Sequence, residues 1–314
     1  MKEILSVGKS GNAIVTLAIG GNYLSKWEQY ASPTIIEYCK INSLGLYLQD
    51  VSLDNSTTPK KFQWQKILLP AQLSKLYPKV KNFCYLDSDI IANPNKGSVF
   101  DYHINGSLSL VSQVKNLPLP LNLTQRIIAF YRHEFYSQEY PLDSALFMTP
   151  EQILQFQGFP LKDDYACMGL IMGSISDFSS RLEEIYFKYD ESVLTLTGGG
   201  DEPILNHEFQ SAFPINWIPY EFQAIWLFEM AWKYPFLYKR SWDSDLIRDC
   251  AESVLLGNTF LHFAGSWGES RMIEAGNFFN MEGDMQVRFS EYLKMKVTGE
   301  PKGLIRPHLI NNEN

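Results

Sequence analysis

The stretch from Asn82 to Asp89 constrains the fold more than any other part of the sequence. Four apolar residues, Phe83 to Leu86, run directly into two carboxylates, Asp87 and Asp89, that one serine separates. An apolar run this short is typical of a strand that helices cover on both faces, as in a parallel sheet. Because open α/β sheets bind their ligands where such strands end, we expect an α/β fold with a site at this point.

The two carboxylates suit a cation. If the backbone stays extended through Ser88, the side chains of Asp87 and Asp89 point to the same side. Converging carboxylates are hard oxygen ligands for Mg²⁺ or Mn²⁺ and, through the cation, for a diphosphate. The alternative is a plain turn after the strand, since Asp and Ser are also common turn residues. The Asp-Ser-Asp sequence alone does not separate the two.

Charge and composition exclude some classes of protein. A net charge of −8 argues against non-specific nucleic-acid binding. The four cysteines form no Cys-x-x-Cys pair, which fits a reducing compartment better than a zinc cluster or a disulfide framework. No stretch reaches the roughly 18 apolar residues of a membrane span, and the N-terminal residues lack a signal-peptide pattern. We therefore expect a cytoplasmic protein without a transmembrane segment, which leaves peripheral membrane association open.

Strand and helix patterns alternate around the central stretch. We expect strands at 13–19, 44–53, 83–86 and 107–114, with helices over 23–41 and 62–77 between the first three. This alternation favours right-handed parallel crossovers. Further strands are predicted at 167–173, 213–218 and 254–263, and further helices over 123–136, 178–189 and 201–210.

The first predicted strand ends at Gly20-Gly21, where Asn22 is a plausible N-cap for the following helix. Pro33 predicts a kink or a break within that helix. A strand, a glycine turn and a helix can open a nucleotide site. However, Gly20-Gly21 is not a Gly-x-Gly-x-x-Gly fingerprint and lacks the P-loop lysine, so the signal is weak by itself.

A glycine-rich segment, 198–200, precedes Asp201 and Glu202. Glycines can adopt positive φ, which a loop needs to hinge or to approach a ligand closely. Asp201 is suited to cap the helix that follows. Glu202 is not needed for capping and is free to face a reacting centre, the alternative being a solvated glutamate in the first helical turn.

His262 lies on an apolar segment near the C-terminal end of the pattern. A lone histidine there is usually a buried residue satisfied by its neighbours, but imidazole is also the common nitrogen partner of two carboxylates on Mn²⁺. Gly265 would let backbone amides approach phosphate oxygens. Arg271 would supply positive charge to the same anion, with an exposed surface arginine as the alternative.

Two segments show no clear period. Residues 137–164 hold three prolines, and we expect a lid or an acceptor-side insertion there. The tract 217–242 carries seven aromatic residues before Pro235, for which core packing and an acceptor platform both fit.

Four segments together resemble retaining glycosyltransferases of the GT-A fold. Their order is most similar to family 8, which includes glycogenin and bacterial lipopolysaccharide galactosyl- and glucosyltransferases. The segments are the first strand up to Asn22-Tyr23, the helix and Asp-x-Asp strand over 66–90, Gly-Asp-Glu-Pro-Ile-Leu-Asn at 200–206, and His-Phe-x-Gly at 262–265. The family's Lys-Pro-Trp after the last motif is missing. Asp201-Glu202 is closer to the blood-group-type family 6 enzymes, in which the glutamate is the candidate nucleophile.

The resemblance implies a mainly parallel twisted sheet flanked by helices, in a single GT-A domain over 1–314. That domain would hold a nucleotide-sugar-binding half (13–115), an acceptor and catalytic half (116–275) and a C-terminal extension (276–314). The resemblance also implies residue roles: metal ligation of Mn²⁺ or Mg²⁺ by Asp87, Asp89 and His262, catalysis by Glu202 and Asp201, and donor contacts from Ala18, Asn22, Tyr23, Lys66, Ser88, Gly265 and Arg271.

The expected function is metal-dependent, retaining transfer of a hexose from a UDP-sugar to a hydroxyl group of a glycan, lipid or protein. One alternative is a nucleotidyltransferase similar to sugar-nucleotide pyrophosphorylases, which would need a basic glycine-rich loop after the first strand. Residues 20–27 hold only Lys26 in that position. The others are a catalytically silent nucleotide-sugar-binding protein and a plain scaffold.

Overall fold

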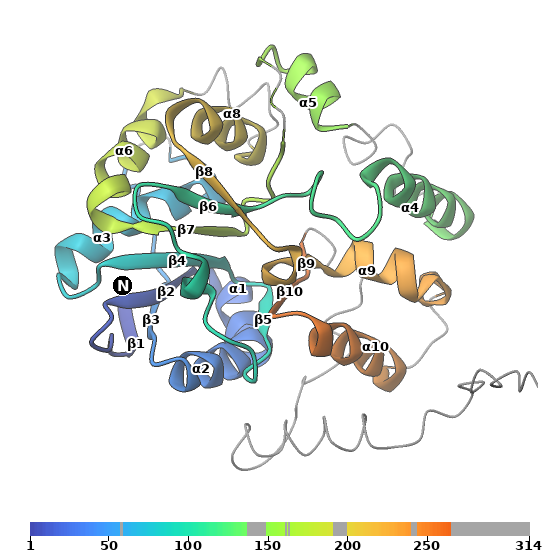
Figure 1. The fold of residues 1–314 in the computed structure, drawn as a ribbon, viewed down its shortest axis with the longest axis horizontal. Helices are drawn as coiled ribbons and strands as arrows, with labels where there is room; N and C mark the ends of the chain where they lie inside the picture. The colour runs from blue at the N-terminus through green and yellow to red at the C-terminus, as the bar shows by residue number, and fades with distance from the viewer. Residues whose placement is uncertain are drawn as a thin grey trace, which may run out of the picture. The chain divides into compact units, whose positions relative to one another are not determined.

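A seven-stranded sheet forms the centre of the unit over residues 1–278, in the order β1-β3-β2-β4-β7-β6-β8 (Figure 1). The computed structural model describes residues 1–56, 59–136, 149–160, 162, 164–190, 200–239 and 244–264, and residues 1–278 form one unit. The strands are β1 (Lys2–Leu5), β2 (Asn12–Leu17), β3 (Gly45–Gln49), β4 (Asn82–Asp87), β6 (Leu108–Val111), β7 (Leu170–Ser174) and β8 (Ile215–Ile218).

Most strands of this sheet run in one direction. β2 pairs in parallel with both β3 and β4, and β6 pairs in parallel with β8. β7 lies antiparallel between β4 and β6, and β1 is an antiparallel edge strand beside β3. The predicted parallel crossovers and the α/β class, with a mostly parallel sheet flanked by helices, are therefore confirmed. The division of the chain at 115 and 275 stays a prediction.

A second, three-stranded sheet lies beside the end of β4 and has the order β5-β10-β9. Its strands are β5 (Ile90–Ala92), β9 (Ala224–Ile225) and β10 (Phe260–His262). β10 pairs antiparallel with β5, with Ile90 opposite His262, and parallel with β9. This sheet brings His262 back to the residues that follow β4.

The prediction of one strand over 254–263 is wrong. Residues 244–257 form helix α10 (Ser244–Gly257), and only Phe260–His262 is extended, in the small sheet. The buried apolar residues of α10 recur at helical spacing, namely Ile247, Cys250, Ala251, Val254 and Leu255. The apolar pair at 254–255 therefore continues the buried face of a helix.

The first crossover is one continuous helical segment that contains a π-helical turn. α1 (Gly21–Lys26) continues through a π-helical turn, η1 (Trp27–Ala31), into α2 (Ser32–Ile41). Pro33 lies in the first turn of α2, directly after this π-helical turn, so the α-helical pattern is interrupted just before the proline while the helical backbone continues through it. Asn22 is not the N-cap, because the helix begins at Gly21, two residues earlier than predicted, and its N-cap is Gly20, whose φ of 94° suits glycine.

Helices cover both faces of the main sheet. η2 (Phe62–Leu68), α3 (Leu69–Leu76) and α6 (Ile175–Lys188) contact one another, and they share an apolar core with the sheet residues Val15, Phe83 and Tyr85. α8 (Glu202–Ala212) contributes Leu205 and Phe209 to the same core. α2 contacts β3 and β5 on the other side. β4 is thus covered on both faces, as its apolar sequence predicts.

The remaining described helices are η3 (Val99–Tyr102), α4 (Leu121–Tyr136), α5 (Pro150–Phe156), η5 (Tyr220–Phe222), α9 (Trp226–Lys233) and η6 (Pro235–Tyr238). Within the aromatic tract, Tyr220, Phe222, Trp226 and Phe228 are buried, which favours core packing for them. α5 lies in the predicted insertion, whose residues 137–148 are outside the described part. None of the described helices combines the length and the hydropathy that crossing a membrane requires.

Candidate active site

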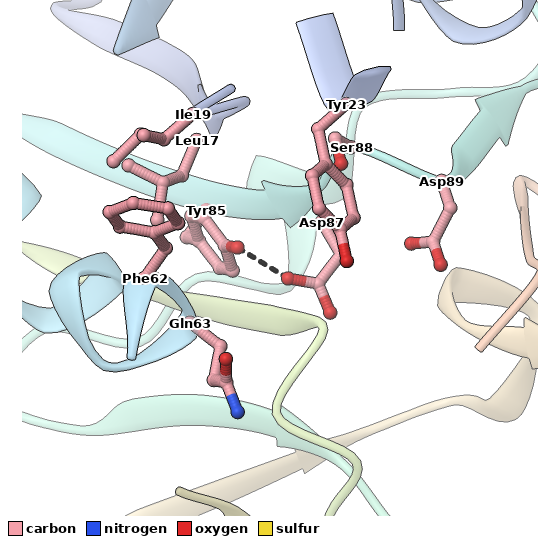
Figure 2. Close-up of a pocket in the computed structure, with 9 residues that line it drawn as sticks. All are labelled: Leu17, Ile19, Tyr23, Phe62, Gln63, Tyr85, Asp87, Ser88 and Asp89. Carbon is pink, nitrogen blue, oxygen red and sulfur yellow. Dashed lines mark hydrogen bonds between the residues drawn. The ribbon is translucent and has the colours of Figure 1, made fainter. Parts of the chain in front are cut away.

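A pocket of about 210 Å³ opens at the carboxyl ends of β2 and β4 (Figure 2). Its lining residues come from the two strands, α1, η2 and the turn after β4: Leu17, Ile19, Tyr23, Phe62, Gln63, Tyr85, Asp87, Ser88 and Asp89. The rings of Tyr23 and Phe62 remain about half exposed, at 53% and 46%. Polar carboxylates and accessible aromatic rings therefore share one opening, as in sites for small ligands.

Two carboxylates and an imidazole converge at this pocket. His262 Nε2 lies 3.2 Å from Asp89 Oδ1 and 3.6 Å from Asp87 Oδ2. One potential ligand atom from each of the three residues lies within 4.8 Å of the others. These atoms are oxygens and a ring nitrogen, which is a donor set for a divalent cation.

The convergence depends on a turn and on strand pairing. The backbone turns at Ser88 and Asp89 instead of staying extended, and both carboxylates lie on the same side of this turn (Figure 2). Phe263 N–H donates to Asp89 O at 3.1 Å, next to the Ile90–His262 pair of the β5–β10 ladder. The two carboxylates therefore lie on the same side, as expected, but a turn and not an extended strand places them there.

Charge balance in the cluster requires a positive partner. Burial raises the pKa of Asp87, against the opposing charge of Lys66. Burial would also raise the pKa of Asp89, but the charge and hydrogen bond of His262 outweigh it and lower that pKa. Burial alone would lower the pKa of His262, yet the Asp89 charge holds it well above its ordinary value. A proton on His262 or a bound cation meets this requirement.

Lys66 connects Asp87 to Asp201. Its ammonium group is 3.0 Å from Asp201 Oδ2, 3.7 Å from Asp87 Oδ1 and donates to Met168 O at 2.9 Å. The lysine side chain is 4% exposed, and although burial lowers its pKa, the two carboxylates raise it to a net value above the ordinary one. Because these three acceptors already surround its ammonium group, Lys66 is better suited to positioning the two carboxylates than to contacting a sugar donor directly.

The predicted capping role of Asp201 is wrong. Asp201 occupies the N-cap position of α8, but its side chain makes no capping hydrogen bond. Its carboxylate turns instead to Lys66, because a buried ammonium group needs a counter-charge more than a helix end needs a cap. Tyr85, which sequence reasoning missed, adds a hydroxyl that donates to Asp87 Oδ1 (Figure 2).

Glu202 begins α8 beside Asp201. Burial first, and then the charge of Asp201, raise the pKa of Glu202 to about 7. The neighbouring Tyr165 hydroxyl opposes this rise in the pKa of Glu202, and Tyr165 is a second residue that the sequence did not indicate. A carboxyl group with a pKa near neutrality can act as a nucleophile, acid or base.

The other predicted donor residues divide into three groups. Tyr23 and Ser88 line the pocket. Ala18 is buried just after β2, with its N–H on Gln49 O at 2.9 Å, and Asn22 is exposed in α1, so neither lines the pocket. Gly265 and Arg271 lie outside the described residues.

No protein-family model matches the sequence, and no curated protein matches it. Among solved structures, one similar chain is a glycosyltransferase involved in the glycosylation of the major capsid of PBCV-1, with a TM-score of 0.45, 11% identity, and coverage of 84% of this chain and 99% of that one. A second is the galactosyltransferase LgtC in complex with donor and acceptor sugar analogues, with a TM-score of 0.46, 13% identity, and coverage of 83% and 94%. A third is the WbbM bifunctional glycosyltransferase, with a TM-score of 0.43, 11% identity, and coverage of 83% and 46%, so this chain spans less than half of that one. Likenesses this distant indicate nothing about the reaction or the substrates of this chain.

Proposed function

We propose that this chain is a metal-dependent, retaining glycosyltransferase of the GT-A type, which moves a hexose from a UDP-sugar to a hydroxyl group of a glycan, lipid or protein. The observation that carries the proposal is the convergence of Asp87, Asp89 and His262 at a pocket where parallel strands end. Ligand sites of open α/β sheets lie at this edge. Carboxylates in such a place suit a nucleoside diphosphate only if a cation stands between them.

The residues present fit a divalent cation. Two carboxylate oxygens and the Nε2 atom of His262 face one another, while Lys66 approaches the other oxygen of Asp87. A mixed oxygen and nitrogen set suits Mn²⁺, and Mg²⁺ favours the oxygens. When bound, the cation would neutralise the diphosphate and stabilise the leaving group as charge develops.

The chain's own residues supply the rest of the site. The accessible rings of Tyr23 and Phe62 suit stacking on a planar base, because both line the pocket. Lys66 fixes the carboxylates of Asp87 and Asp201, so that both keep their orientation when a donor binds. A positioned pair of this kind reduces the reorganisation needed during reaction.

Glu202 is the candidate nucleophile. In a double displacement its carboxylate oxygen attacks the anomeric carbon as the bond to the diphosphate breaks. The acceptor hydroxyl then displaces the carboxylate and gives its proton to the released diphosphate. Two inversions give net retention. The alternative route to retention is front-face attack, in which the departing diphosphate guides the acceptor. In that route Glu202 acts only through its charge and forms no bond to the sugar.

A UDP-release assay over a panel of UDP-sugars with Mn²⁺ tests the proposal. We expect release with at least one donor, its loss in EDTA, and an α-linked product by the anomeric proton signal in NMR. Glu202→Gln should lose most turnover while keeping donor binding. Glu208→Gln is its matched control, because Glu208 is a buried glutamate of the same helix that pairs with Lys188 at 2.7 Å.

Other outcomes identify the alternatives. Uridine nucleotide binding without any UDP release would indicate a silent nucleotide-sugar-binding protein. Diphosphate release from UTP and a sugar phosphate would indicate a nucleotidyltransferase. A β-linked product would mean inversion and would remove the role of Glu202.

A further inference from the structure

The imidazole of His262 has two differently occupied sides. Its Nε2 atom faces Asp87 and Asp89, whereas its Nδ1 atom faces Gln223 at 3.1 Å and the Cys167 sulfur at 3.6 Å. A neutral imidazole has one N–H and one lone pair, so the contact at Nδ1 decides which of them is presented at Nε2.

The backbone fixes the orientation of the Gln223 carboxamide. With its oxygen toward the ring, Gln223 accepts from His262 Nδ1 at 3.1 Å and from the N–H groups of Gly169 and Leu170, each at 3.2 Å. Its nitrogen then donates to Cys167 O at 3.2 Å. The reverse orientation would place the NH₂ group against two backbone donors and the oxygen against a carbonyl, which leaves buried groups unpaired.

Gly169 makes room for this contact. A Cβ atom at position 169 would lie 2.3 Å from His262 Cε1 and 2.6 Å from the Gln223 carboxamide atom that faces the ring, which in this orientation is the oxygen. Both side chains are almost completely buried, at 2% exposed for His262 and 1% for Gln223. The ring and the amide therefore pack directly against bare backbone, where neither has space to rotate.

We propose that Gln223 is a positioning residue that holds His262 with its proton on Nδ1 and its Nε2 lone pair directed to a divalent cation between Asp87 and Asp89. This inference rests on the proposed function for its metal. Because the carboxamide oxygen already accepts two backbone N–H groups, its orientation does not depend on the state of the histidine. A hydrogen bond of this kind, behind a metal-binding histidine, fixes both the tautomer and the ring orientation.

Cys167 is the competing neighbour of Nδ1. If its thiol donated to Nδ1, the proton of a neutral ring would move to Nε2 and the ligand lone pair would be lost. A thiol is a weak donor, however, whereas the Gln223 oxygen is held at Nδ1 by two backbone N–H groups and can only accept there. The amide therefore determines the tautomer.

The test measures Mn²⁺ affinity from free Mn²⁺ in electron paramagnetic resonance, without turnover. We expect Gln223→Met to weaken Mn²⁺ binding about 10–100-fold. Gln223→Glu keeps an oxygen acceptor for Nδ1–H and should stay within about threefold of the unchanged protein. Cys167→Ala, at the other neighbour of the same nitrogen, should leave the affinity unchanged. Melting temperatures of all three variants separate loss of fold from loss of metal.

Nitrogen-15 NMR of the imidazole in the Zn²⁺-loaded, unsubstituted protein gives a second readout that needs no variant. We expect a protonated Nδ1 and a metal-bound Nε2 for His262. A metal-bound Nδ1, a Gln223→Met protein with full Mn²⁺ affinity, or a Cys167→Ala protein that loses as much affinity as Gln223→Met would each overturn the inference. A protein that binds Mn²⁺ in this way but transfers no sugar would refute the proposed function and leave the role of Gln223 standing.

Discussion

Asp87 stands between two partners that balance its charge in different ways. On one side Lys66 is a permanent cation, buried in the fold and shared with Asp201. On the other side His262 and Asp89 leave a position that only a proton or a metal ion completes. The protein itself supplies the counter-charge on the lysine side, so substitution of Lys66 should mainly lower the free energy of unfolding. An exchangeable cation supplies it on the histidine side, so substitution of His262 or Asp89 should mainly weaken ligand binding and turnover.

The largest expected effect is on the histidine side. Asp89→Asn removes a carboxylate ligand with little change in shape, and we expect kcat/KM for the UDP-sugar to fall about 10³-fold, since the electrostatic stabilisation of the leaving group is lost. Initial rates of UDP release measure it, and circular dichroism checks the fold. Asp101→Asn, at an exposed carboxylate of η3, is the control. Transfer that survives both Asp89→Asn and EDTA would remove the metal from the mechanism.

Lys66→Met tests the lysine side. The substitution leaves two carboxylates facing each other without their buried counter-charge, and we expect the free energy of unfolding to fall by roughly 3–5 kcal/mol. Urea denaturation measures this change. Lys40→Met, in an exposed pair with Glu37, should change it by less than about 1 kcal/mol. If stability were kept while Mn²⁺ affinity was lost, Lys66 would belong to the cation site and the contrast between the two sides would fail.

His262→Ala should show the opposite balance. We expect Mn²⁺-dependent UDP binding to weaken about 10–100-fold, because the nitrogen ligand is lost. The melting temperature should fall much less than it does in Lys66→Met. Calorimetric titration with and without Mn²⁺, together with thermal unfolding, measures both quantities. A large loss of stability with unchanged metal affinity would make His262 an ordinary core residue.

The smallest predicted effect is on pH dependence. The pKa of Glu202 is raised to about 7, so this carboxyl group takes up a proton as the pH falls through 7 and loses its nucleophilic form. We expect kcat/KM to be about tenfold below its plateau at pH 6. The charge of Lys66 lowers this pKa, so the acid limb should move to higher pH in Lys66→Met. If the acidic limb of the pH dependence of kcat/KM is unchanged in Glu202→Gln, a group other than Glu202 causes it.

Sequence reasoning found the residues whose role follows from local pattern. The apolar run before Asp87 predicts β4, and the position of the acidic pair at its end predicts the site. The resemblance of residues 262–265 to a His-Phe-x-Gly motif pointed to His262. The pairing of β10 with β5 explains why it lies beside Asp89. Pro33 predicted an irregularity in the first crossover helix, and a π-helical turn directly precedes it, although the helix start at Gly21 was not predicted.

What sequence reasoning missed depends on contacts between distant segments. Tyr165 and Gln223 meet the site only because β7 pairs with β4 and because β9, which follows Gln223, pairs with β10. Asp201 follows the rule for a helix cap, but the charge of Lys66, far earlier in the chain, overrides this local preference. A local sequence pattern does not show which charged side chain from a distant segment will contact a residue in the folded protein.

The β5–β10 pairing also sets when the site can exist during synthesis. Asp87 and Asp89 leave the ribosome about 170 residues before His262, which at 5–20 residues per second is a delay of roughly 10–35 s. Through that interval β2, β3 and β4 can pair, whereas β5 lacks its central partner β10. A nascent chain that ends before residue 260 would hold the carboxylates without the imidazole. The proposed cation site would therefore be complete only after residue 262 has been made.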